Sequence, residues 1–224
     1  MELYLVRHGL SRHNLENPAE CPYDPLFDEI EDHDPSLTSQ GEIQADLTGQ
    51  RLKQVQFDAV LVSPFHRTLS TAAGILRHQA GQLCMEIMPA LAECGTSPEF
   101  RMMPEHLRKT VWPDIREAYP YDLPVDSDHS RWLRAQRVAD TVRKRFAGNE
   151  KVLIVSHGHF MAYYLLSPFL GLSEKQANGR IFGAENCGIT KFLFREDGVI
   201  VAAAMDETGH LGSYVSREPF DITG

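Results

Sequence analysis

Polar side chains that can bind or attack an anion follow three apolar stretches of the sequence. Each stretch reads as a buried strand, and the residues after it are Arg7-His8-Gly9 after 3–6, Ser63-Pro64 and then Arg67 after 57–62, and His157-Gly158 after 151–156. Continuous apolar strands of this kind are typical of parallel sheets that helices cover on both faces. Ligands of such sheets bind beyond the carboxyl ends of the strands, so we expect these residues to meet at one edge.

The expected cluster combines two arginines with two histidines, and this combination indicates a site for a dianionic phosphoryl group. Without an anion these groups would repel one another. Arg7 and Arg67 offer planar forks of N–H donors that match phosphate oxygens and stay charged at any working pH. Nearby cations disfavour protonation of an imidazole, which keeps one histidine neutral and able to attack phosphorus. The other histidine can stabilise charge on the transferred group.

Phosphoryl transfer also needs a proton donor for the leaving oxygen, and Glu93 is the candidate. It lies in Leu91-Ala92-Glu93, after a short predicted strand at 84–88. A carboxylic acid there could protonate the leaving group and afterwards act as a general base toward water. A single glutamate after a strand is also typical of a solvated surface, so its spacing alone leaves both interpretations open.

Strands and helices alternate along the chain, and this order predicts an α/β fold. We expect a three-layer α/β/α sandwich with a mostly parallel central sheet and a small cap insertion. The predicted helices begin at the N-cap Thr38, run from about 65 to 79 with Pro64 in the first turn, and run from about 130 to 146. Near the end, 188–195 and 199–204 flank Glu196-Asp197-Gly198, whose Asp-Gly pair predicts a β-hairpin.

The length of 224 residues suits a single domain, 1–224, with two unusual segments. Residues 15–36 hold eight acidic residues and no Lys or Arg, which predicts an acidic loop. That loop fits either a solvated surface or a lid that screens the site from unwanted anions. Residues 94–130 are rich in proline and aromatic residues, and they predict a cap insertion that is partly helical near 104–118.

Several motifs in order give the sequence a resemblance to the histidine phosphatase superfamily, also called the phosphoglycerate mutase-like family. The similar segments are 7–14 (RHGLSRHN), 37–45 (LTSQGEIQA), 63–72 (SPFHRTLSTA), 91–93 (LAE), 155–158 (VSHG), 186–190 (NCGIT) and His210-Leu211. They span almost the whole chain except 15–36 and 94–130. An Arg-His-Gly triplet alone would be weak evidence for this family. Several matching elements in the same order are strong evidence for it.

The resemblance implies a role for each matching residue. His8 would be the nucleophile and Glu93 the proton donor, while Arg7, Arg67 and His157 would form the phosphate pocket. Asn14 would contact the phosphoryl group or the substrate. We add Ser63 and Gly158 as substrate-binding positions, because helix N-termini there could supply backbone N–H donors.

Two positions depart from the family pattern, and metal or cofactor chemistry is not indicated. Leu10 stands where Glu or Gln is frequent, so a substrate contact is in doubt, and Gly188 stands where Ser is common, with little expected effect. His157 and His159 resemble a metal pair, but in a strand-to-helix turn their side chains should diverge. The family needs no metal, and the sequence has no Walker-type phosphate loop and no dinucleotide fingerprint, so we expect no cofactor.

Composition limits the partners of this chain. The net charge of −9 disfavours nucleic acid and anionic membranes, which leaves a small phosphorylated substrate as the expected partner. No Cys-x-x-Cys pair, signal peptide or transmembrane stretch is evident, so we expect a cytoplasmic protein with reduced thiols. The sequence leaves the oligomeric state and the substrate open.

Three functions fit the sequence, and we favour a metal-independent phosphomonoesterase. The second is a phosphoglycerate mutase, an isomerase that returns the phosphoryl group to another hydroxyl of its substrate. Mutases of the family carry a longer insert, with a Glu-Tyr pair and paired arginines, which 94–104 (CGTSPEFRMMP) does not resemble. The third is a non-catalytic phosphate-binding regulatory module, and the presence of all five candidate catalytic residues argues against it.

Overall fold

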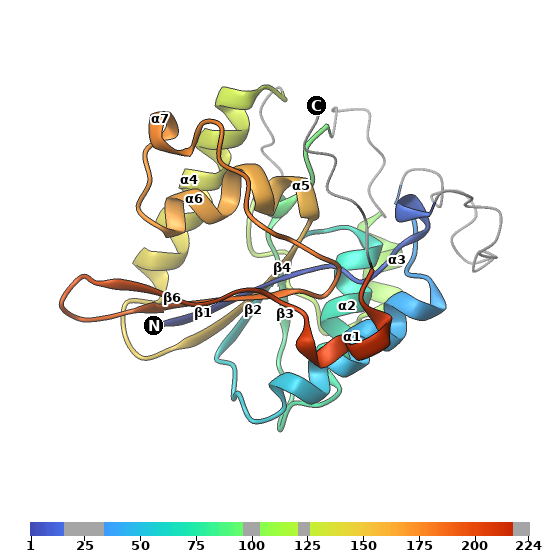
Figure 1. The fold of residues 1–224 in the computed structure, drawn as a ribbon. Helices are drawn as coiled ribbons and strands as arrows, with labels where there is room; N and C mark the ends of the chain where they lie inside the picture. The colour runs from blue at the N-terminus through green and yellow to red at the C-terminus, as the bar shows by residue number, and fades with distance from the viewer. Residues whose placement is uncertain (16–33, 96–103, 121–125, 217–224) are drawn as a thin grey trace.

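The computed structural model of the protein shows a mixed sheet flanked by helices (Figure 1). The structure describes residues 1–15, 34–95, 104–120 and 126–216. The strands in these ranges are β1 Glu2–Arg7, β2 Ala59–Val62, β3 Met85–Ile87, β4 Lys151–Ser156, β5 Ile189–Phe194 and β6 Ile200–Glu207.

The described strands form one sheet in the order β3-β2-β4-β1-β5-β6. The first four of these strands are mutually parallel. At one side of the sheet, β5 is antiparallel to β1, and β6 is antiparallel to β5. The predicted α/β class and mostly parallel sheet are therefore confirmed. The hairpin is confirmed as well, because β5 and β6 flank the predicted turn, where Gly198 has a φ of +81°.

The helices cover segments close to those predicted. The described α-helices are α1 Ser39–Leu52, α2 His66–Leu76, α3 Glu105–Val111, α4 Asp128–Arg145, α5 Gly158–Phe160, α6 Leu166–Phe169 and α7 Glu174–Ala177. A π-helix η5 (Met161–Leu165) joins α5 to α6. The described 3-10 helices are η1 Arg12–Asn14, η4 Pro89–Leu91 and η6 Gly209–Tyr214.

Two predicted helix starts have different outcomes. Thr38 caps α1 as predicted, because its hydroxyl accepts a hydrogen bond from the N–H of Gly41 over 3.0 Å. The prediction for α2 was wrong in detail, since the helix begins after Phe65 and ends at Leu76. Pro64 therefore precedes the N-cap instead of standing in the first turn.

The alternation of side chains along the strands divides the core into two apolar layers. Leu3 and Leu5 of β1 pack with α4 and α6, while Tyr4 and Val6 pack with α1 and α2. Figure 1 shows these helix pairs on opposite faces of the sheet, which is the sandwich that the sequence predicted. Both faces of β1 are buried, so the position of the strand end that carries Arg7 and His8 is fixed by packing on both sides.

The two unusual segments lie partly outside the described residues. Most of the predicted acidic loop (16–33) and two parts of the predicted cap (96–103 and 121–125) are not described. In the described part of the cap, α3 lies within the helical stretch predicted from the sequence. The buried guanidinium of Arg108 donates to Glu117 over 2.6 and 3.0 Å, so this cation is paired inside the cap.

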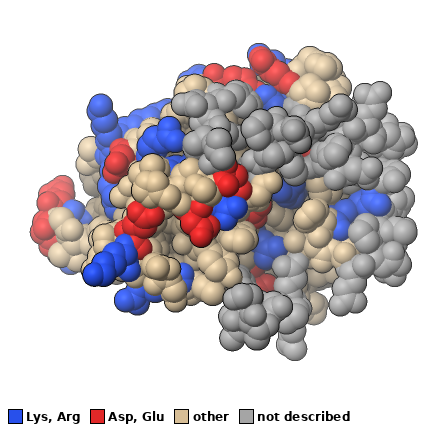
Figure 2. Space-filling model, turned by 90° about the horizontal axis from the view of Figure 1, so that it is seen from above, with Lys and Arg blue, Asp and Glu red and all other residues tan. Residues whose placement is uncertain are grey.

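The surface shows no strong segregation of charge on the face drawn in Figure 2. Acidic and basic side chains are mixed over the described part of that face. Within the described ranges, we find no helix with both the length and the apolar character needed to span a bilayer.

Candidate active site

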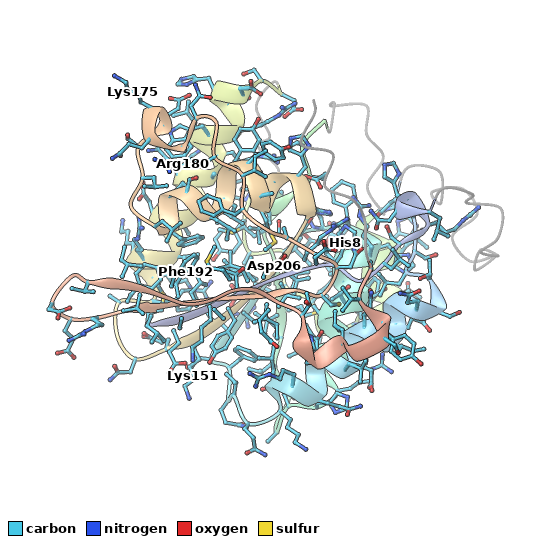
Figure 3. All side chains as sticks on the ribbon, viewed as in Figure 1. His8, Lys151, Lys175, Arg180, Phe192 and Asp206 are labelled. Carbon is cyan, nitrogen blue, oxygen red and sulfur yellow. The ribbon has the colours of Figure 1, made fainter. Side chains whose placement is uncertain are left out.

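The carboxyl ends of β1, β2 and β4 lie side by side and bring the two predicted histidines together. The N–H of His8 donates to Ser156 O over 3.0 Å, and the N–H of Ser63 donates to Val155 O over 3.1 Å. The ring centroids of His8 and His157 are 5.3 Å apart. Figure 3 shows His8 at the end of the sheet where these strands finish. The convergence expected from the three strand ends is therefore present in the structure.

A main-chain carbonyl fixes the tautomer of His8. Nδ1 of its ring lies 2.8 Å from Gly9 O. A carbonyl oxygen can only accept a hydrogen bond, so Nδ1 must carry the proton. In a neutral imidazole the other nitrogen then keeps its lone pair, so the lone pair of His8 lies on Nε2.

Burial and neighbouring cations keep His8 neutral. Its pKa lies well below the ordinary histidine value, first because the ring is buried and then because Arg67 and Arg7 disfavour a second positive charge nearby. The hydrogen bond to Gly9 O opposes this shift but is the smaller effect. His8 is therefore a neutral imidazole at physiological pH.

Gly9 allows the loop after β1 to touch the N-terminus of α1. A Cβ on Gly9 would lie 2.5 Å from Gly41 O, and a Cβ on Gly41 would lie 2.1 Å from Leu10 O. Real side chains do not approach a carbonyl oxygen so closely. The N–H of Gly9 also donates to the hydroxyl of Thr71 over 3.0 Å. The loop that carries His8 is thus held against both α1 and α2.

A serine hydroxyl holds the second histidine. Nε2 of His157 lies 2.7 Å from Ser63 Oγ, and the ring of Phe65 packs edge-on against the imidazole with centroids 5.0 Å apart. His157 is completely buried. Burial first, and then the charge of Arg67, lower its pKa well below the ordinary value. Unlike a carbonyl, a hydroxyl can donate or accept, so this bond leaves both tautomers of His157 open.

Arg7 lies on the backbone of Gly158. A Cβ on Gly158 would sit 2.8 Å from Nε of Arg7, so any side chain at that position would displace the guanidinium. Nη1 of Arg7 donates to Ala184 O over 3.0 Å. The two predicted positions Arg7 and Gly158 are therefore in direct contact, and the role of Gly158 here is to make room for a cation.

The second arginine lies near a carboxylate from the end of the acidic segment 15–36. Both oxygens of Asp34 lie 2.9 Å from the N–H of His66, the first residue of α2, and Oδ1 is 3.5 Å from Nη1 of Arg67. Asp34 is completely buried. The guanidinium of Arg67 also lies over the ring of Phe65, with its central carbon 4.7 Å from the ring centroid. Arg67 thus contacts both a carboxylate and an aromatic ring.

Glu93 accepts hydrogen bonds from the start of the helix that follows His157. Its Oε1 accepts from the N–H groups of Phe160 and Cys94, each over 2.8 Å, and its Oε2 accepts from the N–H of His159 over 3.2 Å. Burial lowers the pKa of Arg67, and the negative charges of Asp34 and then Glu93 oppose that shift. Glu93 is therefore half-buried against the start of α5, and its charge acts on Arg67.

Asn14 lies on η1, and the amide oxygen of its side chain faces Ser11. Oδ1 of Asn14 accepts from the N–H of Ser11 over 3.2 Å and from its hydroxyl over 2.9 Å. The structure does not test the predicted contact of Asn14 with a substrate. Over the described ranges, no three His, Cys, Asp or Glu side chains come close enough together to hold a metal ion.

Two residues near the site were not singled out from the sequence. Asp34 was counted with its acidic neighbours, and only its long-range contact with α2 distinguishes it. Arg134 of α4 is buried with its guanidinium 4.2 Å from the Phe160 ring, and its charge contributes to the low pKa of His157. The sequence does contain a pattern that could have identified Arg134. It is spaced four and eight residues from Val138 and Val142, so it lies on the apolar face of α4.

Comparisons with known proteins agree with this geometry. The model of the histidine phosphatase superfamily (branch 1) matches residues 3–207. An acid phosphatase from Mycobacterium tuberculosis is 27% identical to this chain over 213 residues, which are 93% of each protein.

Solved structures with the same fold include two phosphatases. Phosphoserine phosphatase from Entamoeba histolytica, in complex with 3-phosphoglyceric acid, is 25% identical, and the match covers 94% of this chain and 98% of that one, with a TM-score of 0.60. Ecdysone phosphate phosphatase from Bombix mori, in complex with tungstate, is 15% identical, and the match covers 92% and 94%, with a TM-score of 0.69. The second likeness shows the fold alone. From the family match over nearly the whole chain, we conclude that this protein belongs to the histidine phosphatase superfamily.

Proposed function

We propose that the chain hydrolyses small phosphomonoesters through a phosphohistidine on Nε2 of His8, without a metal ion. The observation that carries this proposal is the bond between Nδ1 of His8 and Gly9 O, because it leaves the lone pair on Nε2. A buried imidazole that stays neutral beside two arginines is suited to attack a phosphate dianion.

In the first step, Nε2 of His8 attacks phosphorus, and the bond between phosphorus and the ester oxygen breaks. Arg7, Arg67 and His157 neutralise charge on the non-bridging oxygens as it builds up. The leaving oxygen takes a proton from Glu93 and departs as an alcohol. In the second step, water attacks the phosphohistidine and gives its proton to Glu93, which restores neutral His8 and releases inorganic phosphate.

The position of Glu93 supports this role in proton transfer. Three backbone N–H groups hold its carboxyl group beside the helix that begins after His157. Because the charge of Glu93 acts on Arg67, its carboxyl group is near the cation that would bind the phosphoryl group. A proton donor and a phosphate-binding cation must be neighbours for the leaving oxygen to meet both.

The first experiment measures phosphate release from a panel of phosphomonoesters that includes p-nitrophenyl phosphate, phosphoserine and 3-phosphoglycerate, with EDTA present. We expect release by the wild type, none by His8→Ala, and normal rates for His106→Ala, which removes an exposed histidine of α3. Loss of activity in EDTA would contradict the metal-free step. Conversion of 3-phosphoglycerate to 2-phosphoglycerate without phosphate release would identify the chain as a mutase instead.

A further inference from the structure

The bulge in strand β6 places an acidic side chain against a loop that contacts the active site. Ile189 pairs with Glu207, but the next pair is Lys191 with Ala204, so β6 has one extra residue at this point. Asp206 lies in the bulge with a φ of +48°, and its N–H donates to Thr190 Oγ1 over 3.0 Å. Bulges next to active sites commonly redirect a side chain.

The loop beside Asp206, residues 183–188, supports the two catalytic candidates at the end of β1. Ala184 O accepts from the guanidinium of Arg7 over 3.0 Å. The side-chain amide of Asn186 donates to His8 O over 2.9 Å, and the N–H of Cys187 donates to Arg7 O over 3.0 Å. Movement of this loop would therefore move both Arg7 and His8.

The carboxylate of Asp206 fits closely against the loop. Its Oδ1 accepts from the N–H of Glu185 over 2.8 Å. A Cβ on Gly188 would lie 2.1 Å from Oδ1, and a Cβ on Gly183 would lie 2.5 Å from Oδ2. The expectation that a glycine at 188 has little effect stays a prediction, but the carboxylate of Asp206 fills the space that a side chain at 188 would need.

The surroundings of Asp206 connect it to Arg7 electrostatically. Burial raises the pKa of Asp206, whereas the bond from the N–H of Glu185 and the charge of Arg7 lower it. The labelled Asp206 lies over the sheet on the side of β6 that leads toward His8 in Figure 3. Asp206 is thus close enough to the phosphate-binding cation for its own charge to matter.

We propose that Asp206 is a positioning residue, which holds loop 183–188 so that Ala184 O orients Arg7 toward the phosphoryl group. The proposal rests on the proposed function for the identity of the bound group. In this proposal the bulge in β6 directs the carboxylate of Asp206 toward the loop, and Gly188 leaves the space that the carboxylate occupies. Asp206 itself is separated from the reacting atoms by the loop and is not a catalytic residue.

The sign of an anion-binding effect tests this proposal. If Asp206 acted through its negative charge alone, removing that charge would strengthen the binding of inorganic phosphate. If it positions Arg7, losing the hydrogen bond to Glu185 would weaken phosphate binding. Asp206→Gly removes the carboxylate and accepts the positive φ at no steric cost. Asp206→Asn removes the charge but keeps an acceptor oxygen, and asparagine also tolerates this conformation.

The experiment measures the dissociation constant of inorganic phosphate by calorimetry, together with kcat and KM for p-nitrophenyl phosphate. We expect Asp206→Gly to weaken phosphate binding and to lower kcat/KM by about five- to tenfold, the size of one lost hydrogen bond. Asp206→Asn should keep most of both. The control Asp197→Asn changes the exposed turn between β5 and β6 and should change neither.

A double-mutant cycle with Gly188→Ala tests the close fit. In the wild-type background this substitution should displace the carboxylate and cause the same loss as Asp206→Gly. In the Asp206→Gly background it should cost little more, because its nearest remaining contact would be Glu185 O at 3.1 Å. Additive losses, tighter phosphate binding in both Asp206 variants, or a lower melting temperature with unchanged phosphate binding would each overturn the proposal. Because phosphate binding is measured without turnover, the test stands even if no ester is hydrolysed.

Discussion

The two buried histidines of the site share their charge environment but differ in the atom that holds each ring. Burial and Arg67 lower the pKa of both. His8 bonds to a main-chain carbonyl, which accepts only, whereas His157 bonds to the hydroxyl of Ser63, which can reverse its direction. The carbonyl therefore fixes one tautomer, and the hydroxyl allows two.

This difference suits the two similar side chains to the different roles proposed for them. A nucleophile must offer the same lone pair to every substrate, and the bond to Gly9 O provides that. A group that stabilises a changing charge benefits from a partner that can adjust. The hydroxyl of Ser63 can accept a hydrogen bond from Nε2 or donate one to it as the charge on the phosphoryl oxygens develops. Substitutions at His8, His157 and Ser63 should therefore have different effects.

The largest effect is expected from His8 itself. His8→Ala removes the atom that forms the covalent intermediate, so kcat should fall by at least about 10⁴-fold. Steady-state release of p-nitrophenol measures it, and circular dichroism checks the fold. A residual rate within about a hundredfold of the wild type would assign the nucleophile to another group.

The loss at His157 should be smaller and of a different kind. His157→Asn keeps a side chain that can reach Ser63 but removes the imidazole that stabilises the transferred group. We expect kcat to fall by about 10²- to 10³-fold, as for other single donors to a developing charge. A quenched reaction should still contain phosphoenzyme. An effect on kcat as large as that of His8→Ala, with no phosphoenzyme, would remove the distinction between the two histidines.

Ser63 should have a still weaker effect, since it acts through His157. Ser63→Ala removes one hydrogen bond of about 1 kcal/mol, so kcat/KM should fall by about fivefold. The matched control is Ser167→Ala, which removes another buried hydroxyl, on α6, and should leave kcat/KM unchanged. Equal losses in both variants would show that Ser63 matters only for packing.

The last expected effect concerns stability in acid and leaves catalysis aside. A histidine whose folded pKa lies below its unfolded value of about 6.5 binds a proton more readily when unfolded, so stability is lost as the pH falls below that value. Between pH 7.5 and 5.5 His157 should account for up to about 1.4 kcal/mol of the lost free energy of unfolding. Urea melts of His157→Asn should show a shallower decline than the wild type. A decline as steep as that of the wild type would mean that His157 is already charged in the folded protein.

The sequence predicted best the positions of residues that directly follow a strand. The run 3–6 must be buried on both faces, and a parallel sheet then determines where Arg7 and His8 lie. The same argument placed Arg67 and His157 correctly. Glu93 follows a short strand and η4, and spacing alone could not decide whether it turned inward; its bonds to the start of α5 decide that.

The residues that were missed act through contacts distant in sequence. In the sequence, nothing distinguishes Asp34 from its acidic neighbours. Only the folded structure shows that its carboxylate accepts a hydrogen bond from the N–H of His66, at the start of α2. Asp206 depends on a bulge in β6, and β6 has no buried face, so its hydrophobic pattern specifies the register with β5 only weakly. The space beside Gly188 could not be predicted either, because the carboxylate of Asp206 occupies it.

The most direct test of the account is the chemical identity of the phosphoenzyme. The wild type is mixed with p-nitrophenyl phosphate, quenched in base and digested, and the phosphopeptide is analysed by mass spectrometry and ³¹P NMR. The account predicts a phosphoryl group on His8, attached to Nε2, the nitrogen left free by the bond to Gly9 O. A phosphoryl group on Nδ1 of His8, or on His157, would contradict it.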